Sequence, residues 1–280
     1  MTVCQQAERS LNTVFRTTIR NRVVDAVKQY ELLREGDRVA VCISGGKDSM
    51  LLAKCLQELQ RHGDFPFHLE YMTMDPGYSP ENRRELEENA RALGIPLHVF
   101  ETDVFRVAER HGKNPCFLCA RMRRGWLYAR ARELGCNKIA LGHHYDDVVE
   151  TILMAMVYGG QIQTMLPKLH SDNYEGLELI RPLYLVREAD VIAWAGANGL
   201  TFLGCACAVT AKRGDGEGSK RAEVKRLIAQ LCEGNPQIKQ NIMNSVKNIN
   251  LCQVLGYHKG NTKRNFLDDY DETAYNEIIL

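Results

Sequence analysis

The sequence has no hydrophobic run long enough to cross a membrane. Its longest apolar stretch lies near Val148–Val157, well short of the roughly 20 residues that a membrane helix needs. The N-terminus also lacks the basic, apolar and small segments of a secretion signal, because polar residues such as Gln5, Glu8 and Arg9 interrupt it. We therefore expect a cytoplasmic protein with no membrane partner.

The chain has no excess of charge of either sign and no internal repeat or low-complexity block. Its formal net charge is +1 and 45% of its residues are hydrophobic, as in an ordinary globular protein. The distribution of charge is more informative than the total, because arginines cluster at 121–132 while acidic residues gather at 268–272. A locally basic surface can bind RNA phosphates even when the total is neutral.

Ten cysteines are present, and in a reducing compartment they should not form disulfides. Clustered cysteines then become candidates for metal binding. Cys116 and Cys119 form a C-x-x-C just before a candidate helix, and Cys205 and Cys207 form a distant C-x-C. Four cysteine ligands would suit structural zinc, whereas three would suit an iron–sulfur cluster with one iron left without a protein ligand.

Strand and helix patterns alternate through the middle of the chain. The candidate strands are Val39–Ile43, Phe67–Met74, Pro96–Phe100, Lys138–Leu141 and, more weakly, Leu179–Ile180. The candidate helices are Asp48–Arg61, Glu81–Leu93, Ala120–Leu134 and Asp147–Val157. This alternation predicts an α/β fold, a parallel sheet with helices on both faces, in which ligands bind at the carboxyl ends of the strands. Cys42 and Cys55 fall inside these elements and are expected in the core.

Three regions follow from this pattern. Residues 1–35 are predicted to be an N-terminal helical segment, and residues 36–203 the catalytic domain. Strand signals stop beyond about residue 200, and helix patterns follow at Ser219–Leu231 and Pro236–Leu251. Residues 204–280 are therefore predicted to be a helical C-terminal extension.

A glycine turn follows the first candidate strand and opens a helix. It reads Ser44-Gly45-Gly46-Lys47-Asp48-Ser49. Such a turn directs unpaired backbone N–H groups and a positive helix end at one place, where a phosphate group can be held. Lys47 adds a point charge, and Ser44 and Ser49 add hydroxyl donors. The turn differs from the G-x-x-x-x-G-K-[ST] loop of other nucleotide-binding proteins.

The helix after the C-x-x-C separates its side chains by face. At 100° per residue, four lie together on a face that either contacts RNA or is simply solvated: Arg121, Arg124, Tyr128 and Arg132. The opposite side, with Met122, Trp126, Leu127 and Leu134, is expected in the core. Arg123 falls among these apolar residues, a costly position unless its guanidinium meets an anion. We therefore take Arg123 as a site residue.

These motifs resemble a known family. The glycine turn is similar to the PP-loop of the N-type ATP pyrophosphatases, which split ATP between its α- and β-phosphates. Over roughly residues 30–210 the chain resembles the tRNA 2-thiocytidine synthetase family of these enzymes, which share an adenine-nucleotide α-hydrolase-like sheet. The resemblance rests on Cys116–Gly125, Lys138–Asp147, Tyr158-Gly159-Gly160, Pro167-Lys168-Leu169 and Arg181-Pro182-Leu183.

The resemblance implies roles for individual residues. The ATP-binding residues would be Ser44, Gly45, Gly46, Lys47, Asp48, Ser49, Asp75 and Gly142. Gly142 would let the adenosine lie close to the fourth strand, and Asp75 would lie near the nucleotide and its Mg²⁺, unless it only shapes an Asp-Pro-Gly turn. The catalytic residues would be Asp147, Arg123 and Asp48. Asp147 with Glu150 also forms a helix-capping pattern. Arg121, Arg124 and Arg132 would contact the RNA.

The family carries a 4Fe–4S cluster on three cysteines. Cys116 and Cys119 match two of them. The third ligand is expected at Cys205, with Cys207 as the alternative, because the C-x-C here replaces the second C-x-x-C that the family usually shows.

The implied reaction is 2-thiolation of a cytidine in the anticodon loop of tRNA, expected at position 32. ATP would adenylate the C2 oxygen, and cluster-bound sulfide would replace it, with sulfur from a cysteine desulfurase or free sulfide. A homodimer is a further expectation. The alternatives are a PP-loop thiolase of another base, an amidating PP-loop ligase, and a zinc-bound RNA-binding module. The C-x-x-C argues against the ligase, and the intact Lys47 and Asp48 argue against the module.

Overall fold

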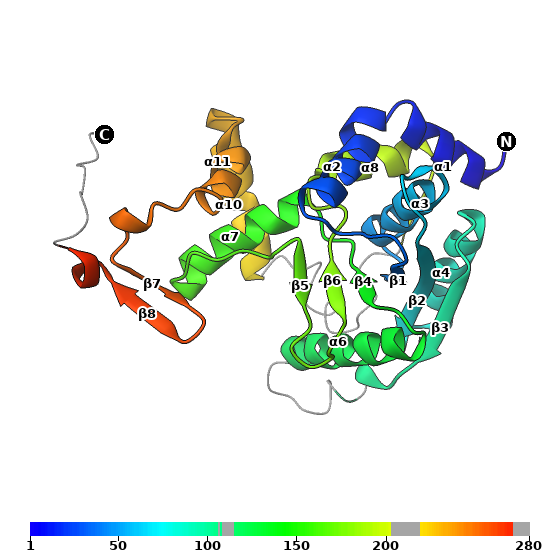
Figure 1. Ribbon diagram of the computed structural model, residues 1–280. Coiled ribbons are helices and arrows are strands. Elements are labelled where there is room, and N and C mark those ends of the chain that lie inside the picture. The colour runs from blue at the N-terminus through cyan, green and yellow to red at the C-terminus, as the bar shows by residue number, and fades with distance from the viewer. Residues whose placement is uncertain (106, 108–114, 203–218, 271–280) are drawn as a thin grey trace.

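A computed structural model describes residues 1–105, 107, 115–202 and 219–270 of the chain (Figure 1). Its centre is a six-stranded sheet in the order β3-β2-β1-β4-β6-β5. The strands are β1 Arg38–Cys42, β2 His68–Asp75, β3 Leu97–Glu101, β4 Lys138–Ala140, β5 Lys168–His170 and β6 Glu178–Ile180. The predicted α/β class is confirmed, and so are the five predicted strands.

One edge of the sheet departs from the all-parallel prediction. Neighbouring strands are parallel from β3 to β6, but β5 pairs antiparallel with β6. Strand β5 was not predicted, because it has only three residues and none of them is fully buried. Leu177 and Leu179 flank the start of β6 and are buried, which explains why the weak strand signal there was correct.

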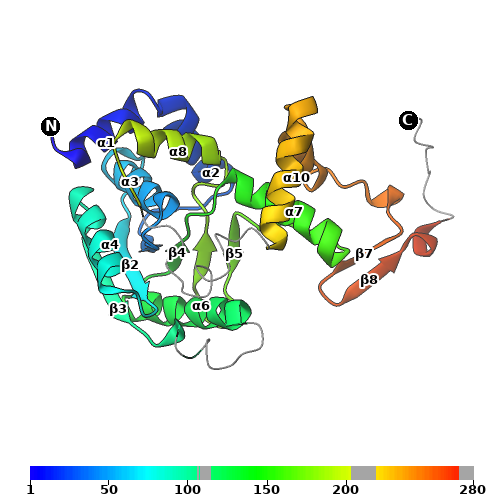
Figure 2. The ribbon, with the colours of Figure 1, turned by 180° about the vertical axis from the view of Figure 1, so that it is seen from behind.

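The first strand contributes to cores on both sides of the sheet. Val39 and Val41 belong to the core that contains α3 Lys47–His62, and Ala40 and Cys42 to the core that contains α6 Pro115–Glu133. This alternation is what a strand covered on both faces requires. Helices therefore cover both faces of the sheet, as predicted (Figures 1 and 2).

The N-terminal segment packs outside α3. It comprises α1 Val3–Asn12, the π-helix η1 Arg16–Arg20 and α2 Asn21–Gln29, and α8 Glu188–Ala197 lies beside it. Helix α4 Pro80–Ala92 follows β2. The α1–α3 contact contains a buried cation, because the Nζ of Lys54 is fully buried and donates to Glu8 Oε1 at 2.7 Å. Helix α8 was not predicted.

The C-terminal helices build a second core on α7 Tyr145–Gly159. Helices α10 Lys220–Gly234 and α11 Ile238–Ser245 contribute Val224, Ile228 and Met243, which pack with Val148 and Ile152 of α7. No helix among the described residues is both long and apolar enough to cross a membrane.

The C-terminal extension, predicted to be helical, also contains a hairpin that was not predicted. Strands β7 Gly256–Lys259 and β8 Thr262–Asn265 form an antiparallel hairpin between the short 3₁₀ helices η2 Leu251–Gln253 and η3 Phe266–Asp269. All eight strand residues are exposed. Because neither face of this hairpin is buried, its sequence carries no apolar alternation that would have revealed it. Helix α11 is also shorter than the predicted Pro236–Leu251.

Candidate functional site

The glycine turn lies between β1 and α3, with Gly46 as the N-cap of the helix. The hydroxyl of Ser49 holds the turn closed, because it accepts from the N–H of Ser44 at 3.1 Å and donates to the carbonyl of Gly46 at 2.9 Å. Gly45 has a φ of +86°, a conformation that favours glycine. The turn is thus built as a loop that leaves the first N–H groups of α3 for a ligand.

Lys47 lies between two carboxylates. Its Nζ is 3.2 Å from the carboxylate of Asp48 and 3.5 Å from Oε1 of Glu188. Glu188 also accepts from Lys225 at 2.6 Å. Burial raises the pKa of Glu188, but the hydrogen bond from Lys225 and the charges of both lysines outweigh it and hold that pKa below its ordinary value. Glu188 was not anticipated from the sequence.

The turn after β4 packs directly on the glycine turn. A Cβ added to Gly142 would lie 3.1 Å from the carbonyl carbon of Asp48 and 3.1 Å from the backbone nitrogen of Ser49. Gly142 therefore allows the two predicted motifs to touch. This close approach of two backbones was not predicted.

Asp147 belongs to the first turn of α7, and its capping role differs from the predicted one. The N-cap is His144: its N–H donates to Asp147 Oδ2 at 2.9 Å, and its Nδ1 accepts from the N–H of Asp147 at 3.3 Å. The predicted capping pattern, with Asp147 as the N-cap and Glu150 three residues later, is wrong, because the N-cap lies three residues earlier and Asp147 is its N3 partner. Because Nδ1 accepts, the proton of a neutral His144 is on Nε2, which lies 3.7 Å from Asp48 Oδ1.

The C-terminal helices supply three cations to this region. Arg221 donates to Oδ1 of Asp147 at 3.2 Å and to Oε2 of Glu150 at 2.7 Å. Lys225 pairs with Glu188, and Lys239 pairs with Asp146 Oδ1 at 2.6 Å. The sequence showed basic residues near 220–226 but not their partners, which are more than 30 residues away along the chain.

Asp75 shapes the Asp-Pro-Gly turn after β2, the role that was predicted as its alternative to nucleotide binding. Its Oδ1 accepts from the N–H groups of Gly77 at 2.8 Å and Tyr78 at 2.7 Å, and its Oδ2 accepts from Arg83 at 2.7 Å. Burial raises the pKa of Asp75, but these three hydrogen bonds outweigh it and hold the pKa below its ordinary value. Both of its oxygens are therefore occupied.

Helix α6 carries the predicted arginines. Arg121, Arg124 and Arg132 are exposed, as predicted. Two assignments were wrong, because Tyr128 is buried and Trp126 is 50% exposed. Tyr128 packs with Ala40 and Ile139 under the sheet, and this contact takes the place predicted for Trp126.

Arg123 is half-buried in α6 and is therefore less exposed than Arg121 and Arg124. Burial and Cys136 raise the pKa of the Cys42 thiol to about 12, and the positive charge of Arg123 partly opposes this rise.

Two further polar side chains lie at the ends of β4 and β6 with incomplete partners. Arg181 is buried; one of its terminal nitrogens donates to the carbonyl of Leu166, and its Nε has no partner. His143 has an unpartnered, buried Nδ1, and burial together with the charge of Arg181 lowers its pKa to about 4. His143 is therefore neutral near pH 7. No role for either was predicted, although both stand in the motifs that carry the resemblance.

The structure describes only some of the cysteines that were predicted to bind a metal. The backbones of Cys116 and Cys119 lie in the first turns of α6, three residues apart, but their side chains are outside the described part. Cys205 and Cys207 also lie outside the described residues. Cys42 and Cys55 are buried in the core, as predicted. Within the described part of the chain, no group of three His, Cys, Asp or Glu side chains is placed to hold a metal.

Comparison with known proteins connects these features. A family model described as a PP-loop domain matches residues 12–206. A tRNA-cytidine(32) 2-sulfurtransferase of Syntrophotalea carbinolica is 39% identical over 227 residues, which cover 80% of this chain and 86% of the relative. One of the same name from Geobacter sulfurreducens is 37% identical over 234 residues, 82% of this chain and 89% of the relative.

A solved structure agrees with the fold. The U34-tRNA thiolase NcsA from Methanococcus maripaludis, with its 4Fe–4S cluster, matches with a TM-score of 0.63 at 21% identity. The match covers 86% of this chain and 80% of the thiolase. At this level of identity the likeness concerns the arrangement of the sheet and its helices.

Proposed function

Because the chain belongs to the PP-loop family of tRNA-cytidine(32) 2-sulfurtransferases, we propose that it is an ATP-dependent tRNA thiolase acting on the C2 position of a cytidine. The observation that carries the proposal is the contact between Gly142 and the start of α3. It joins the phosphate-binding turn to the segment that holds Asp147. A tRNA substrate also implies a cytoplasmic location.

In the first step, the C2 oxygen of the cytidine attacks the α-phosphorus of ATP, and the bond to pyrophosphate breaks. The N–H groups at the start of α3 and the ammonium of Lys47 hold the leaving pyrophosphate. Lys47 must leave at least one of its carboxylates to do so. Glu188 is the partner it can release more easily, because Lys225 keeps Glu188 paired.

Mg²⁺ is assigned to Asp48 rather than to Asp75. Asp48 lies beside the phosphate site, and its carboxylate pairs with Lys47 at 3.2 Å and faces Nε2 of His144 at 3.7 Å. It accepts no hydrogen bond from a described backbone N–H, so it can turn to a hard cation more easily than Asp75 can. Asp75 would have to give up Arg83 and two backbone N–H groups to bind the metal. Asp147, held by His144 and Arg221, is kept as a second catalytic carboxylate.

The cysteines are assigned to a 4Fe–4S cluster. Cys116 and Cys119 fit two of its ligands, since cysteines three residues apart at a helix start can bind one metal centre and the helix end favours thiolates. Cys205 is kept as the third ligand, with Cys207 as the alternative. When bound, the cluster would supply the site for the sulfur that replaces the activated oxygen. The NcsA thiolase, which has such a cluster, supports this assignment.

The remaining partners follow from the same reaction. Sulfur would come from a cysteine desulfurase or from free sulfide. Arg121, Arg124 and Arg132 would contact tRNA phosphates, and Arg123 would orient the sulfur or the adenylate. The interface of a homodimer is assigned to apolar side chains that are exposed at and just beyond the end of α7, namely Met156, Val157, Ile162 and Leu166.

Pyrophosphate release tests the proposal. The protein, reconstituted anaerobically with iron and sulfide, should release pyrophosphate only when ATP and cytidine-containing tRNA are both present. The tRNA should gain one sulfur per turnover when a sulfur donor is added. Release of orthophosphate, or release that tRNA does not affect, would remove the adenylation step.

A further inference from the structure

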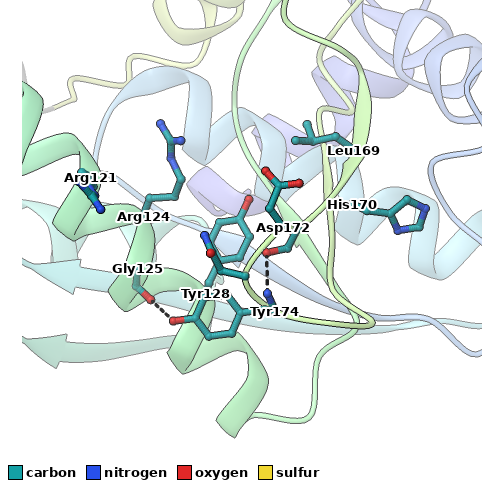
Figure 3. A pocket seen from close by; sticks show the side chains of 10 residues that line it. Arg121, Arg124, Gly125, Tyr128, Leu169, His170, Asp172 and Tyr174 are labelled. Atoms are coloured by element: carbon teal, nitrogen blue, oxygen red, sulfur yellow. Dashed lines mark hydrogen bonds between the residues drawn. The ribbon is translucent and has the colours of Figure 1, made fainter. Parts of the chain in front are cut away.

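A groove opens beside the candidate site, between α6 and the connection from β5 to β6. Its cavity volume is about 500 Å³, within the range of small-molecule sites. Helix α6 contributes Arg121, Arg124 and Gly125, and the connection contributes Asp172 and Tyr174 (Figure 3). The two sides of the groove come from parts of the sequence about 50 residues apart, and the hydroxyl of Tyr174 joins them by donating to the carbonyl of Gly125 at 3.3 Å.

The groove holds positive charge that the protein does not neutralise. Arg121 and Arg124 form no ion pair with any described residue, whereas Arg130 of the same helix pairs with Glu133 at 2.7 Å. Unpaired guanidinium groups around one cavity favour an anionic ligand, and a phosphate matches their geometry.

The groove is not a simple phosphate site. Asp172 is exposed in its lining, forms no ion pair with a described residue, and would repel a lone phosphate. A carboxylate beside arginines instead fits a ligand that has an anion at one end and an N–H donor at the other. The ring of Tyr174 is half-buried and lies 5.6 Å from that of Tyr128, so it offers one aromatic edge to the groove. A ligand that matches these protein groups has a phosphate for the arginines, a ring for Tyr174 and an amino group for Asp172. A nucleotide has all three.

The groove lies beside the proposed cluster ligands. Arg121 and Arg124 follow Cys119 by two and five residues on α6. At a rise of about 1.5 Å per residue, their backbones lie within about 8 Å of that of Cys119 along the helix axis. A chain bound in the groove therefore passes beside the site assigned to the sulfur.

We propose that this groove binds one unpaired nucleotide of the substrate RNA next to the cytidine that is modified. The inference rests on the proposed function. Arg121 and Arg124 hold its phosphate, Tyr174 packs against its base, and Asp172 accepts from an exocyclic amino group. The groove then favours cytosine, adenine or guanine over uracil, which has no amino group.

Binding of a fluorescent anticodon stem–loop at several salt concentrations tests the phosphate contacts. Removing two contacts with single-stranded phosphates, in Arg121→Ala/Arg124→Ala, should lower the slope of log K against log salt by about 1.4. Arg84→Ala/Arg91→Ala removes the same charge from the exposed face of α4 and should leave the slope unchanged. ATP binding should be equal in all three proteins. Equal slopes for the two double variants would overturn the proposal.

Base substitution tests the role of Asp172. With the wild-type protein, uracil in place of the flanking amino-bearing base should weaken binding about 5- to 100-fold, the range of one lost base contact. Asp172→Ala removes the acceptor, so this variant should lose the preference while it still binds ATP. If wild type thiolates the RNA but shows no preference that Asp172→Ala alters, the groove assignment fails and the proposed function stands. If wild type thiolates no RNA at all, the proposed function itself fails.

Discussion

Replacing Gly142 with alanine should disturb the start of α3. The added Cβ would lie 3.1 Å from two backbone atoms, the carbonyl carbon of Asp48 and the nitrogen of Ser49. Neither atom can swing aside as the tip of a side chain can, because both are fixed in the first turn of a helix. Overpacking of this kind costs about 1 to 3 kcal/mol. The strained atoms belong to the turn that binds phosphate, so we expect both a lower free energy of unfolding and weaker ATP binding.

The two effects can be measured separately. Urea unfolding without nucleotide gives the change in stability, provided that the slope m is unchanged, and titration calorimetry gives the ATP affinity. Gly196→Ala in α8 is the matched control, because no atom lies within 4 Å of its added Cβ. Because alanine favours a helix more than glycine does, Gly196→Ala should raise the free energy of unfolding by about 0.5 to 1 kcal/mol and leave ATP binding unchanged.

The pattern of results decides which role Gly142 has. Loss of stability without nucleotide supports the contact between the two turns. Unchanged stability with weaker ATP binding would instead support the role predicted from the sequence, in which Gly142 makes room for adenosine. If Gly142→Ala matched wild type in both measurements, the close packing of β4 on the glycine turn would be refuted.

Three other substitutions test separate parts of the site. Lys47→Met should lower the rate of tRNA-dependent pyrophosphate release about 10²- to 10³-fold with little effect on tRNA binding, and a rate within threefold of wild type would rule out Lys47 as the pyrophosphate ligand. Arg221→Ala should lower the free energy of unfolding by about 1 to 3 kcal/mol in urea titrations, because buried Glu150 loses its partner; Arg221→Lys should recover part of it, and equal losses for both would contradict a charge-based contact. Burial raises the pKa of Glu8, but hydrogen bonds from Lys54 and Arg61 outweigh it and lower that pKa to about 2, so the stability it contributes is present above pH 4.5 and lost as the pH falls toward 2. Glu8→Gln should therefore be less stable than wild type at pH 7, with the gap narrowing between pH 4.5 and 2; a gap that stays constant in acid unfolding would contradict the ion pair.

The sheet and the turn could be predicted from the sequence because their signals are local. Val39–Ile43 is apolar on both faces, and the glycines follow it directly, so strand, turn and helix are specified within about 25 residues. Strand β5 and the β7–β8 hairpin lacked such a signal, the first because it is short and the second because it is exposed. A strand that buries no face has no hydrophobic periodicity by which it could be detected.

The charges around the site could not be predicted for a different reason. Arg221 is 74 residues from Asp147, and Lys47 is 141 residues from Glu188. Their pairing depends on how α10 and α8 return to the sheet, which no local pattern states. Arg181 was similarly hidden, since an arginine after a strand is ordinary until burial without a carboxylate makes it costly.

Mass spectrometry of tRNA nucleosides tests the central claim most directly. A strain that lacks this protein should lose 2-thiocytidine and keep its other thionucleosides. The wild-type gene should restore the modification, whereas Lys47→Met and Cys116→Ser should not. Unchanged 2-thiocytidine in the deletion strain, or its recovery with either variant, would contradict the account.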